Sequence, residues 1–335
     1  MRKFPYAAAL AAGLLVSAFA GGEALAEAKE LRIAKQFGLG YLQFYVLEDQ
    51  KLVEKHAKNA GLGDVAVSWS QFRSSDVMND ALISGSVDFV CLGVPGIATI
   101  WAKTRGNIDV RGVSGLNQLP LMLLTRNPAV KTLKDFTEKD RIAVPAIKVS
   151  MQAMLLQMAA QKEFGPTNTT KFDAMTVSMA HPDATAAMLG GQSEITANFS
   201  SAPFQFRQLK DPKIRRLSSS TEILGGPSSF NVIAATGKFR TKNPKLYGAF
   251  LSALQEATDR INADKKWAAE LYLKAANDKT PVDEMLAMMN DPSIAFTLKA
   301  QGIKPFVDFM TETGTIKVKA EKWQDLFFPD AKGLN

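Results

Sequence analysis

Short apolar segments that alternate with helical patterns constrain the fold of this chain more strongly than any other feature. Residues 31–34, 65–69 and 87–92 are predicted strands, and a segment with helical periodicity follows each of them. The segment 87–92 is almost wholly apolar, as expected for a strand that is covered on both faces. Strands that alternate with helices in this way are typical of an α/β fold built on a parallel sheet.

The connections between these elements carry turn and capping residues. A glycine-bearing turn at 37–40 leads into one predicted helix over residues 42–56. Ser74 and Ser75 can cap the next helix, because a serine hydroxyl accepts hydrogen bonds from the free N–H groups of a first turn. Residues 93–96 turn the chain from the third strand into another helix. These signals support the alternation of strands and helices.

The middle of the chain repeats this scheme. Further strands are predicted at 141–145, 174–179 and 193–197, and helices are predicted after Ser150 and over 183–189. The last third of the chain is mostly helical by the same criteria. The α/β pattern therefore extends over two successive parts of the chain.

A short internal similarity relates these two parts. Residues 81–89 and 187–195 both contain a helix end at a glycine, a turn through an acidic residue and the entry to a strand. Either the two parts are lobes built on a similar plan, or a common connection recurs by chance. Two extended segments, 119–124 and 230–235, would carry the chain from a first lobe to a second lobe and back.

Composition limits the chemistry that the chain can carry. Its 335 residues suggest two domains, and 46% hydrophobic residues are enough to build a core. A single cysteine, Cys91, rules out a disulfide framework and a cysteine-rich metal site. Two histidines, His56 and His181, argue against a histidine-based metal centre. We therefore expect no metal and no cofactor.

The N-terminal segment has the features of a secretory signal. Arg2 and Lys3 precede an apolar run over residues 4–20, and Ala24-Leu25-Ala26 provides small residues for cleavage before Glu27. The alternative is a membrane anchor, which needs about 20 apolar residues. We expect a signal peptide over 1–26 and an unanchored mature protein of residues 27–335 in a bacterial periplasm.

Four segments carry a resemblance to a known family. They are the turn and helix at 37–51, the segment 80–89, the segment 121–145 and the segment 182–191. In their order and spacing these segments resemble the periplasmic substrate-binding proteins of ABC importers for nitrate, sulfonates and taurine. Two features differ from that family: residues 198–204 replace a Trp-Glu-Pro-like triplet, and 137–140 replace a Lys-Gly pair.

The resemblance implies a fold and a set of partners. The expected fold is two-lobed and periplasmic-binding-protein-like (type II), with a mixed sheet flanked by helices in each lobe and two crossing strands. Residues 27–118 and 236–335 would form lobe 1, and residues 119–235 would form lobe 2 with the crossings. A solute would bind between the lobes, and the permease subunits of the inner membrane would receive it. Family precedent implies a monomer.

The position of the ligand follows from the α/β pattern. In such sheets ligands bind beyond the carboxyl ends of strands, where helix N-termini favour anionic groups. The family's loops coincide with these positions. Lys148 could pair with a sulfonate or carboxylate, or it could be an ordinary surface lysine. The serines could bind the ligand or simply cap helices, and the aromatic residues could line the cleft or belong to the core. The candidate ligand-binding residues are Phe37, Gly38, Leu39, Tyr41, Ser74, Ser75, Gly93, Val94, Pro95, Asn117, Lys148, Val149, Ser150, Met151, Asn198, Phe199 and Ser200.

The main functional hypothesis is a solute-binding component that captures a small organic anion, sulfonate-, taurine- or nitrate-like, by hinge closure. One alternative is a binder of a pyrimidine-type or aromatic carboxylate solute. Another is an exported enzyme on the same fold, but the sequence lacks a P-loop, an HExxH motif and a nucleophile elbow, so no catalytic residue is expected.

A pI near 9.3 would suit a protein that binds nucleic acid. The basic residues are dispersed, with Lys213, Arg215 and Arg216 as the densest group, so no nucleic-acid partner is expected.

Overall fold

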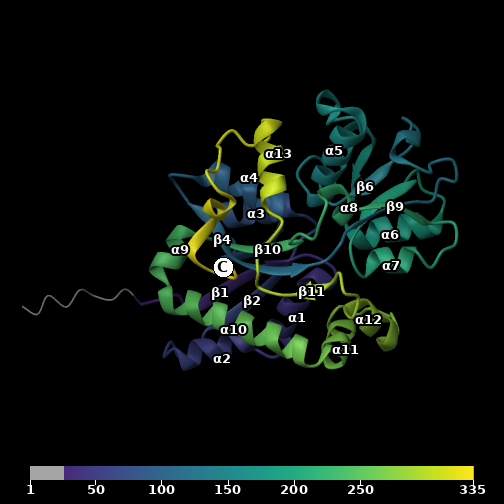
Figure 1. Ribbon diagram of the computed structural model, residues 1–335. Coiled ribbons are helices and arrows are strands. Elements are labelled where there is room, and N and C mark those ends of the chain that lie inside the picture. Colours follow the sequence, from purple (N-terminus) through teal and green to yellow (C-terminus); the bar gives the residue numbers. More distant parts are fainter. Residues whose placement is uncertain (1–25, 335) are drawn as a thin grey trace, which may run out of the picture.

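A computed structural model describes residues 26–334 of the chain. The predicted signal peptide falls almost entirely on residues outside that range. The described chain forms two lobes, each a sheet flanked by helices (Figure 1). We call the lobe with the seven-stranded sheet the large lobe and the lobe with the five-stranded sheet the small lobe. The expected two-lobed α/β fold is confirmed.

The large lobe is built around strands from both ends of the chain. Its sheet has the order β11-β4-β10-β3-β1-β2, and β12 also pairs with β4. Strand β1 is parallel to both of its neighbours, β2 and β3, whereas β10 is antiparallel to β3 and β4. The strands are β1 (Glu30–Lys35), β2 (Ala66–Gln71), β3 (Phe89–Gly93), β4 (Val110–Gln118), β10 (Asn231–Thr236), β11 (Ala295–Phe296) and β12 (Phe327–Lys332).

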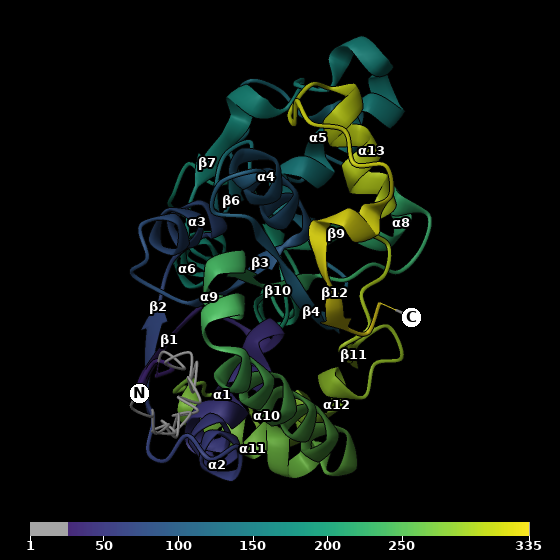
Figure 2. The ribbon, with the colours of Figure 1, turned by 90° about the vertical axis from the view of Figure 1, so that its left-hand side faces the viewer.

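Helices cover both faces of the large sheet (Figure 2). One layer contains α1 (Leu42–Asp49), α2 (Leu52–Asn59), α10 (Pro244–Ala263), α11 (Lys265–Ala275) and α12 (Val282–Met289). The other contains α3 (Ser75–Ile83), α4 (Val94–Thr104) and α13 (Lys304–Glu312), and α9 (Gly237–Lys242) lies at one end. Phe89 of β3 stacks on Phe250 of α10 with ring centroids 3.9 Å apart, so the sheet and the first layer share one core.

The small lobe carries the middle of the chain. Its sheet has the order β7-β6-β8-β5-β9. The strands are β5 (Met122–Thr125), β6 (Ile142–Val144), β7 (Thr176–Ser178), β8 (Ala197–Ser200) and β9 (Arg215–Ser219). The helices are α5 (Met151–Phe164), α6 (His181–Gly190), α7 (Phe204–Gln208) and α8 (Ser220–Leu224). Short 3₁₀ turns lie at Leu39–Tyr41, Leu133–Asp135, Pro166–Asn168, Asp173–Met175 and Trp323–Leu326.

The two lobes follow one plan. The order β2-β1-β3-β10-β4 in the large sheet matches β7-β6-β8-β5-β9 in the small sheet, and each pair of corresponding neighbours has the same relative direction. The internal similarity falls on corresponding connections, from α3 to β3 and from α6 to β8. Of the two interpretations of that similarity, the structure supports lobes built on a similar plan.

Two predicted elements were wrong in their extent. The helix predicted over 42–56 is broken into α1 and α2, because Lys51 adopts the left-handed conformation with φ of 49°. The strand predicted at 193–197 begins only at Ala197. The Ser193 hydroxyl accepts a hydrogen bond from the Ile195 N–H at 3.2 Å, which keeps this segment in a polar turn before the ladder starts.

The chain crosses between the lobes twice, before β5 and after α8. The crossings are tied to each other and to their surroundings: the Leu121 N–H donates to Ser220 Oγ at 3.0 Å, and the Phe230 N–H donates to the Asn117 carbonyl at 3.0 Å. Both connections are therefore held at the base of the cleft. Within residues 26–334, no helix has the length and apolar character needed to cross a bilayer.

Candidate functional site

The lobes face each other across a cleft that holds two cavities. An inner cavity of about 20 Å³ lies at the carboxyl ends of β1, β3 and β6. It is lined by Gln36, Phe37, Tyr41, Ser75, Gly93, Pro145, Ser150, Met151, Gln152, His181, Phe230 and Asn231. An outer cavity of about 630 Å³ opens beyond Phe37. It is lined by Phe37, Gly38, Tyr45, Gln71, Pro182, Phe204, Arg207, Lys210, Tyr272 and residues 275–281.

The N-termini of four helices converge on the inner cavity. Ser75 is the first residue of α3 and Gly93 is the N-cap of α4, both in the large lobe. Ser150 is the N-cap of α5 and His181 is the first residue of α6, both in the small lobe. A first helical turn presents free N–H groups and the positive end of the helix dipole, so this convergence favours a negatively charged group.

The polar side chains around the inner cavity are neutral. The Gln36 amide donates to Ser75 Oγ at 3.3 Å, and the Gln152 amide nitrogen lies 3.2 Å from His181 Nε2. Asn231 donates to the Gly40 carbonyl at 3.0 Å. Among the residues that the structure describes, no Lys, Arg, Asp or Glu lines this cavity. An anion would therefore be bound through hydrogen bonds from neutral donors rather than by an opposite charge.

His181 is neutral in this environment. Its side chain is buried, and the loss of solvation lowers its pKa to about 4. The imidazole stacks on Phe204 with ring centroids 5.6 Å apart and an angle of 14° between the planes. The ring therefore presents one N–H donor and one acceptor nitrogen at neutral pH, and it separates the inner cavity from Phe204 in the outer one.

Glycines allow the two lobes to touch. The Leu39 N–H in the large lobe donates to the Ala202 carbonyl in the small lobe at 3.0 Å. A Cβ on Gly38, which has φ of +107°, would lie 3.0 Å from that carbonyl oxygen. A Cβ on Gly93 would lie 3.1 Å from the Cβ of Met151, across the cleft. The lobes are thus in direct contact around the inner cavity.

An ion pair closes the rim of the outer cavity. One guanidinium nitrogen of Arg207, on α7, lies 2.7 Å from each carboxylate oxygen of Asp278, which follows α11. Asp278 is buried, with 6% of its side chain exposed, and it also accepts hydrogen bonds from Thr280. Lys210 and Glu284 form a second, exposed pair between the lobes. These charges lie at the outer rim, away from the inner cavity.

The structure gathers some of the predicted site residues and separates others. Six line the inner cavity: Phe37, Tyr41, Ser75, Gly93, Ser150 and Met151. Gly38 lines the outer cavity, and Leu39 makes the contact with Ala202. The following residues line neither cavity: Ser74, Val94, Pro95, Asn117, Lys148, Val149, Asn198, Phe199 and Ser200.

Lys148 lies at the surface, and Ser150 and Ser74 act at the starts of helices. Lys148 is exposed, with φ of 65°, in the loop before α5. Ser150 caps α5, because its hydroxyl oxygen accepts from the Ala153 N–H at 3.2 Å. Ser74 is buried and donates to Asp76 in the first turn of α3. Phe199 is fully buried in the core.

Several polar or charged residues that line the two cavities were not predicted from the sequence, among them Gln36, Gln152, His181 and Arg207. Gln36 directly follows β1, and Gln152 is the second residue of α5, so their positions at a strand end and a helix start are signals that could have found them. His181 opens α6. Arg207 carried no signal in the sequence, because its partner Asp278 lies 71 residues away in the chain.

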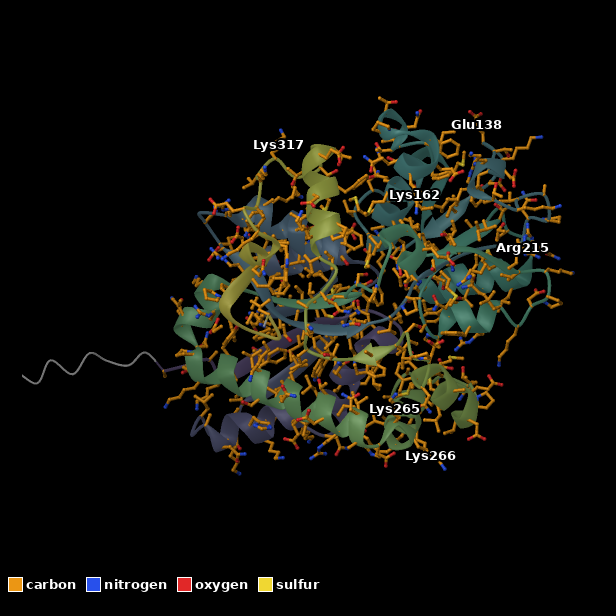
Figure 3. All side chains as sticks on the ribbon, viewed as in Figure 1. Glu138, Lys162, Arg215, Lys265, Lys266 and Lys317 are labelled. Carbon is orange, nitrogen blue, oxygen red and sulfur yellow. The ribbon has the colours of Figure 1, made fainter. Side chains whose placement is uncertain are left out.

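The basic residues are spread over both lobes (Figure 3). In that view Lys162 and Arg215 lie on the small lobe, whereas Lys265 and Lys266 lie at the opposite edge of the large lobe. In the densest basic group, Lys213, Arg215 and Arg216, two side chains bind partners within the small lobe. Arg215 donates to the Asn127 carbonyl at 2.6 Å, and Arg216 pairs with Glu222 at 3.1 Å. In the described part of the chain, no group of three or more His, Cys, Asp or Glu side chains is arranged to hold a metal ion.

The sequence matches the model of the NMT1-like family over residues 25–274, which is more than half of the chain. The chain belongs to the NMT1-like family. No curated protein matches it. Solved structures with the same fold include the alkanesulfonate-binding protein SsuA from Xanthomonas axonopodis pv. citri bound to MOPS, with a TM-score of 0.67 and 19% identity over 88% of this chain and 96% of that one.

Two further structures extend the comparison of this NMT1-like protein. The periplasmic aliphatic sulphonate binding protein SsuA from Escherichia coli has a TM-score of 0.62 and 21% identity, over 89% of this chain and 98% of that one. The periplasmic nitrate-binding protein NrtA from Synechocystis PCC 6803 has a TM-score of 0.64 and 13% identity, over 89% of this chain and 84% of that one. The resemblance that the sequence predicted, to binding proteins for sulfonates and nitrate, is confirmed.

Proposed function

We propose that this NMT1-like protein is the periplasmic solute-binding component of an ABC importer. It captures a small organic anion, sulfonate-, taurine- or nitrate-like, between its lobes and delivers it to the permease. One observation carries the proposal: helices of both lobes direct their N-termini at a single cavity whose side chains are neutral. Such a site stabilises a negative charge without an opposite charge.

Capture would work by closure of the lobes. An anionic group in the inner cavity would accept hydrogen bonds from the large lobe at Ser75 and Gly93, and from the small lobe at Ser150 and His181. These contacts exist together only when the lobes meet. The ligand therefore favours the closed arrangement by its differential affinity, and the two crossings would act as the hinge.

The relatives and the N-terminal sequence agree with this assignment. Structures of the same fold come from proteins that bind sulfonates and nitrate in the periplasm. Residues 1–26 have the pattern of an export signal. We further propose that residues 27–118 with 231–335, and residues 119–230, move as the two bodies of the closing protein. Residues 231–235 were expected in the second body, but they belong to β10, which lies between β3 and β4 in the large sheet.

The proposal is tested by thermal melting of mature protein, residues 27–335, against a panel of taurine, alkanesulfonates, nitrate and carboxylates. A solute that binds the native state raises the melting temperature, by the equivalent of about 2.7 kcal/mol at a hundredfold excess over its dissociation constant. A shift with one of these anions, and no chemical change of that anion, is expected. Turnover of a bound compound, or binding only of neutral or cationic solutes, would overturn the proposal.

A further inference from the structure

The inner cavity is too small to hold a whole organic solute. Its volume of about 20 Å³ admits one or two water-sized groups, whereas sites for small organic molecules usually measure roughly 300–1,000 Å³. The outer cavity, at about 630 Å³, lies in that range. If the head of a ligand enters between the helix N-termini, the remainder of an organic ligand has room only in the outer cavity.

The two cavities are adjacent and share an aromatic residue. Phe37 lines both of them and is only partly buried. On the other side of the boundary, His181 of the inner cavity stacks on Phe204 of the outer cavity. A ligand that passes from one cavity to the other therefore lies beside the ring of Phe37 and the edge of this stacked pair.

Part of the outer cavity's lining is aromatic, beside charged side chains such as Arg207, Lys210 and Asp278. Tyr45 and Tyr272 contact each other edge to face, with ring centroids 5.4 Å apart and planes at 87°, and both side chains are buried. Phe204 lies 5.7 Å from the guanidinium of Arg207, which is itself held by Asp278. Aromatic side chains with few rotatable bonds bind flat rings at a low cost in conformational entropy.

We propose that the outer cavity is a subsite for an aromatic ring, and that the solute is an aromatic sulfonate or carboxylate whose acidic group enters the inner cavity. This inference rests on the proposed function, because it assumes that the helix N-termini bind the acidic group. It selects ring-bearing organic anions over nitrate and short alkanesulfonates. The ring would pack against Phe37, the lining aromatic residue that is only partly buried.

The test compares three sulfonates that differ in the group attached to the sulfonate, together with one aromatic carboxylate. Calorimetry measures the binding of methanesulfonate, benzenesulfonate, naphthalene-1-sulfonate and benzoate to mature protein. A ring adds stacking and buried apolar area, so we expect naphthalene-1-sulfonate to bind at least about tenfold more tightly than methanesulfonate. Equal affinities for all the sulfonates would overturn the aromatic subsite and leave anion capture intact. Absence of binding by every acid would overturn the proposed function itself.

Two variants locate the ring. Ala275→Trp fills the outer cavity from its exposed rim at the end of α11, and Phe37→Leu removes the shared ring. We expect both to reduce the advantage of the aromatic ligand severalfold, with methanesulfonate binding unchanged in Ala275→Trp. Ala186→Trp, at an exposed position of α6 that lines neither cavity, is the matched control. Equal losses for aromatic and methyl ligands in Ala275→Trp would overturn the assignment of the ring to this cavity.

Discussion

Arg207 and Asp278 are joined across the mouth of the cleft, with both carboxylate oxygens 2.7 Å from one guanidinium nitrogen. Arg207 belongs to the small lobe and Asp278 to the large lobe, so the pair exists only when the lobes are together. Asp278 retains the Thr280 N–H as a donor at 2.9 Å whether or not the arginine is present. The pair therefore favours closure without being needed to fold either lobe.

We expect Arg207→Ala to open the unliganded protein. Loss of a partly exposed, charge-assisted pair removes on the order of 1 kcal/mol from the closed arrangement. The radius of gyration from small-angle scattering should rise at low salt, while the melting temperature changes little. High salt should bring the wild type closer to the variant, because ions screen the pair. Arg216→Ala, which removes an exposed pair within the small lobe, is the control. Identical scattering from wild type and Arg207→Ala at both salt concentrations would exclude this role.

Gly93 is expected to set how closely the lobes approach at the inner cavity. Its φ of −65° and ψ of 156° suit any residue, so a substitution acts through space rather than through backbone strain. Gly93→Val would place its side chain against Met151 and into the inner cavity. We expect a larger radius of gyration and at least about a tenfold loss of affinity for any solute found, since 1.4 kcal/mol suffices for that change.

Gly248→Ala supplies the matched control for that variant. Gly248 lies within α10, and a Cβ there meets no atom within 4 Å. Alanine in a helix interior should stabilise the protein by about 0.5–1 kcal/mol and leave solute binding unchanged. Wild-type affinity in Gly93→Val would show that closure around the inner cavity does not depend on this contact.

His181 is expected to make stability depend on pH between about 6.5 and 4. Burial lowers its pKa from 6.5 to about 4, so the unfolded state takes up a proton first as the pH falls. Its contribution is complete above pH 6.5 and is lost progressively down to pH 4, a change on the order of 3 kcal/mol. When denaturation is measured from pH 7 to pH 4, the free energy of unfolding should fall less in His181→Gln than in wild type. Parallel curves for the two proteins would contradict a neutral, buried His181.

How much the sequence predicts differs between the fold and the site. Local patterns located β1, β3 and the start of α5 at Ser150, because strand alternation and capping are properties of neighbouring residues. The break at Lys51 was missed, because the apolar spacing continues across it although the backbone turns left-handed. Contacts between the lobes, such as Arg207 with Asp278 or Gly93 with Met151, join distant positions and leave no local signal. The boundary of the inner cavity consists largely of such contacts.

The last prediction concerns the two corresponding turns that the internal similarity revealed. Asp88 in the large lobe accepts hydrogen bonds from the backbone N–H of Arg32 at 2.9 Å and from its guanidinium at 2.8 and 3.0 Å. In the small lobe, Glu194 lies 3.8 Å from Arg141 and is 71% exposed. We expect Asp88→Asn to cost about 1–2 kcal/mol, because it breaks a charge-assisted, hydrogen-bonded pair in which Asp88 is largely buried and Arg32 is partly exposed. Glu194→Gln should cost less than about 0.5 kcal/mol. Urea denaturation of both variants measures the difference, and equal losses would show that the two turns stabilise their lobes alike.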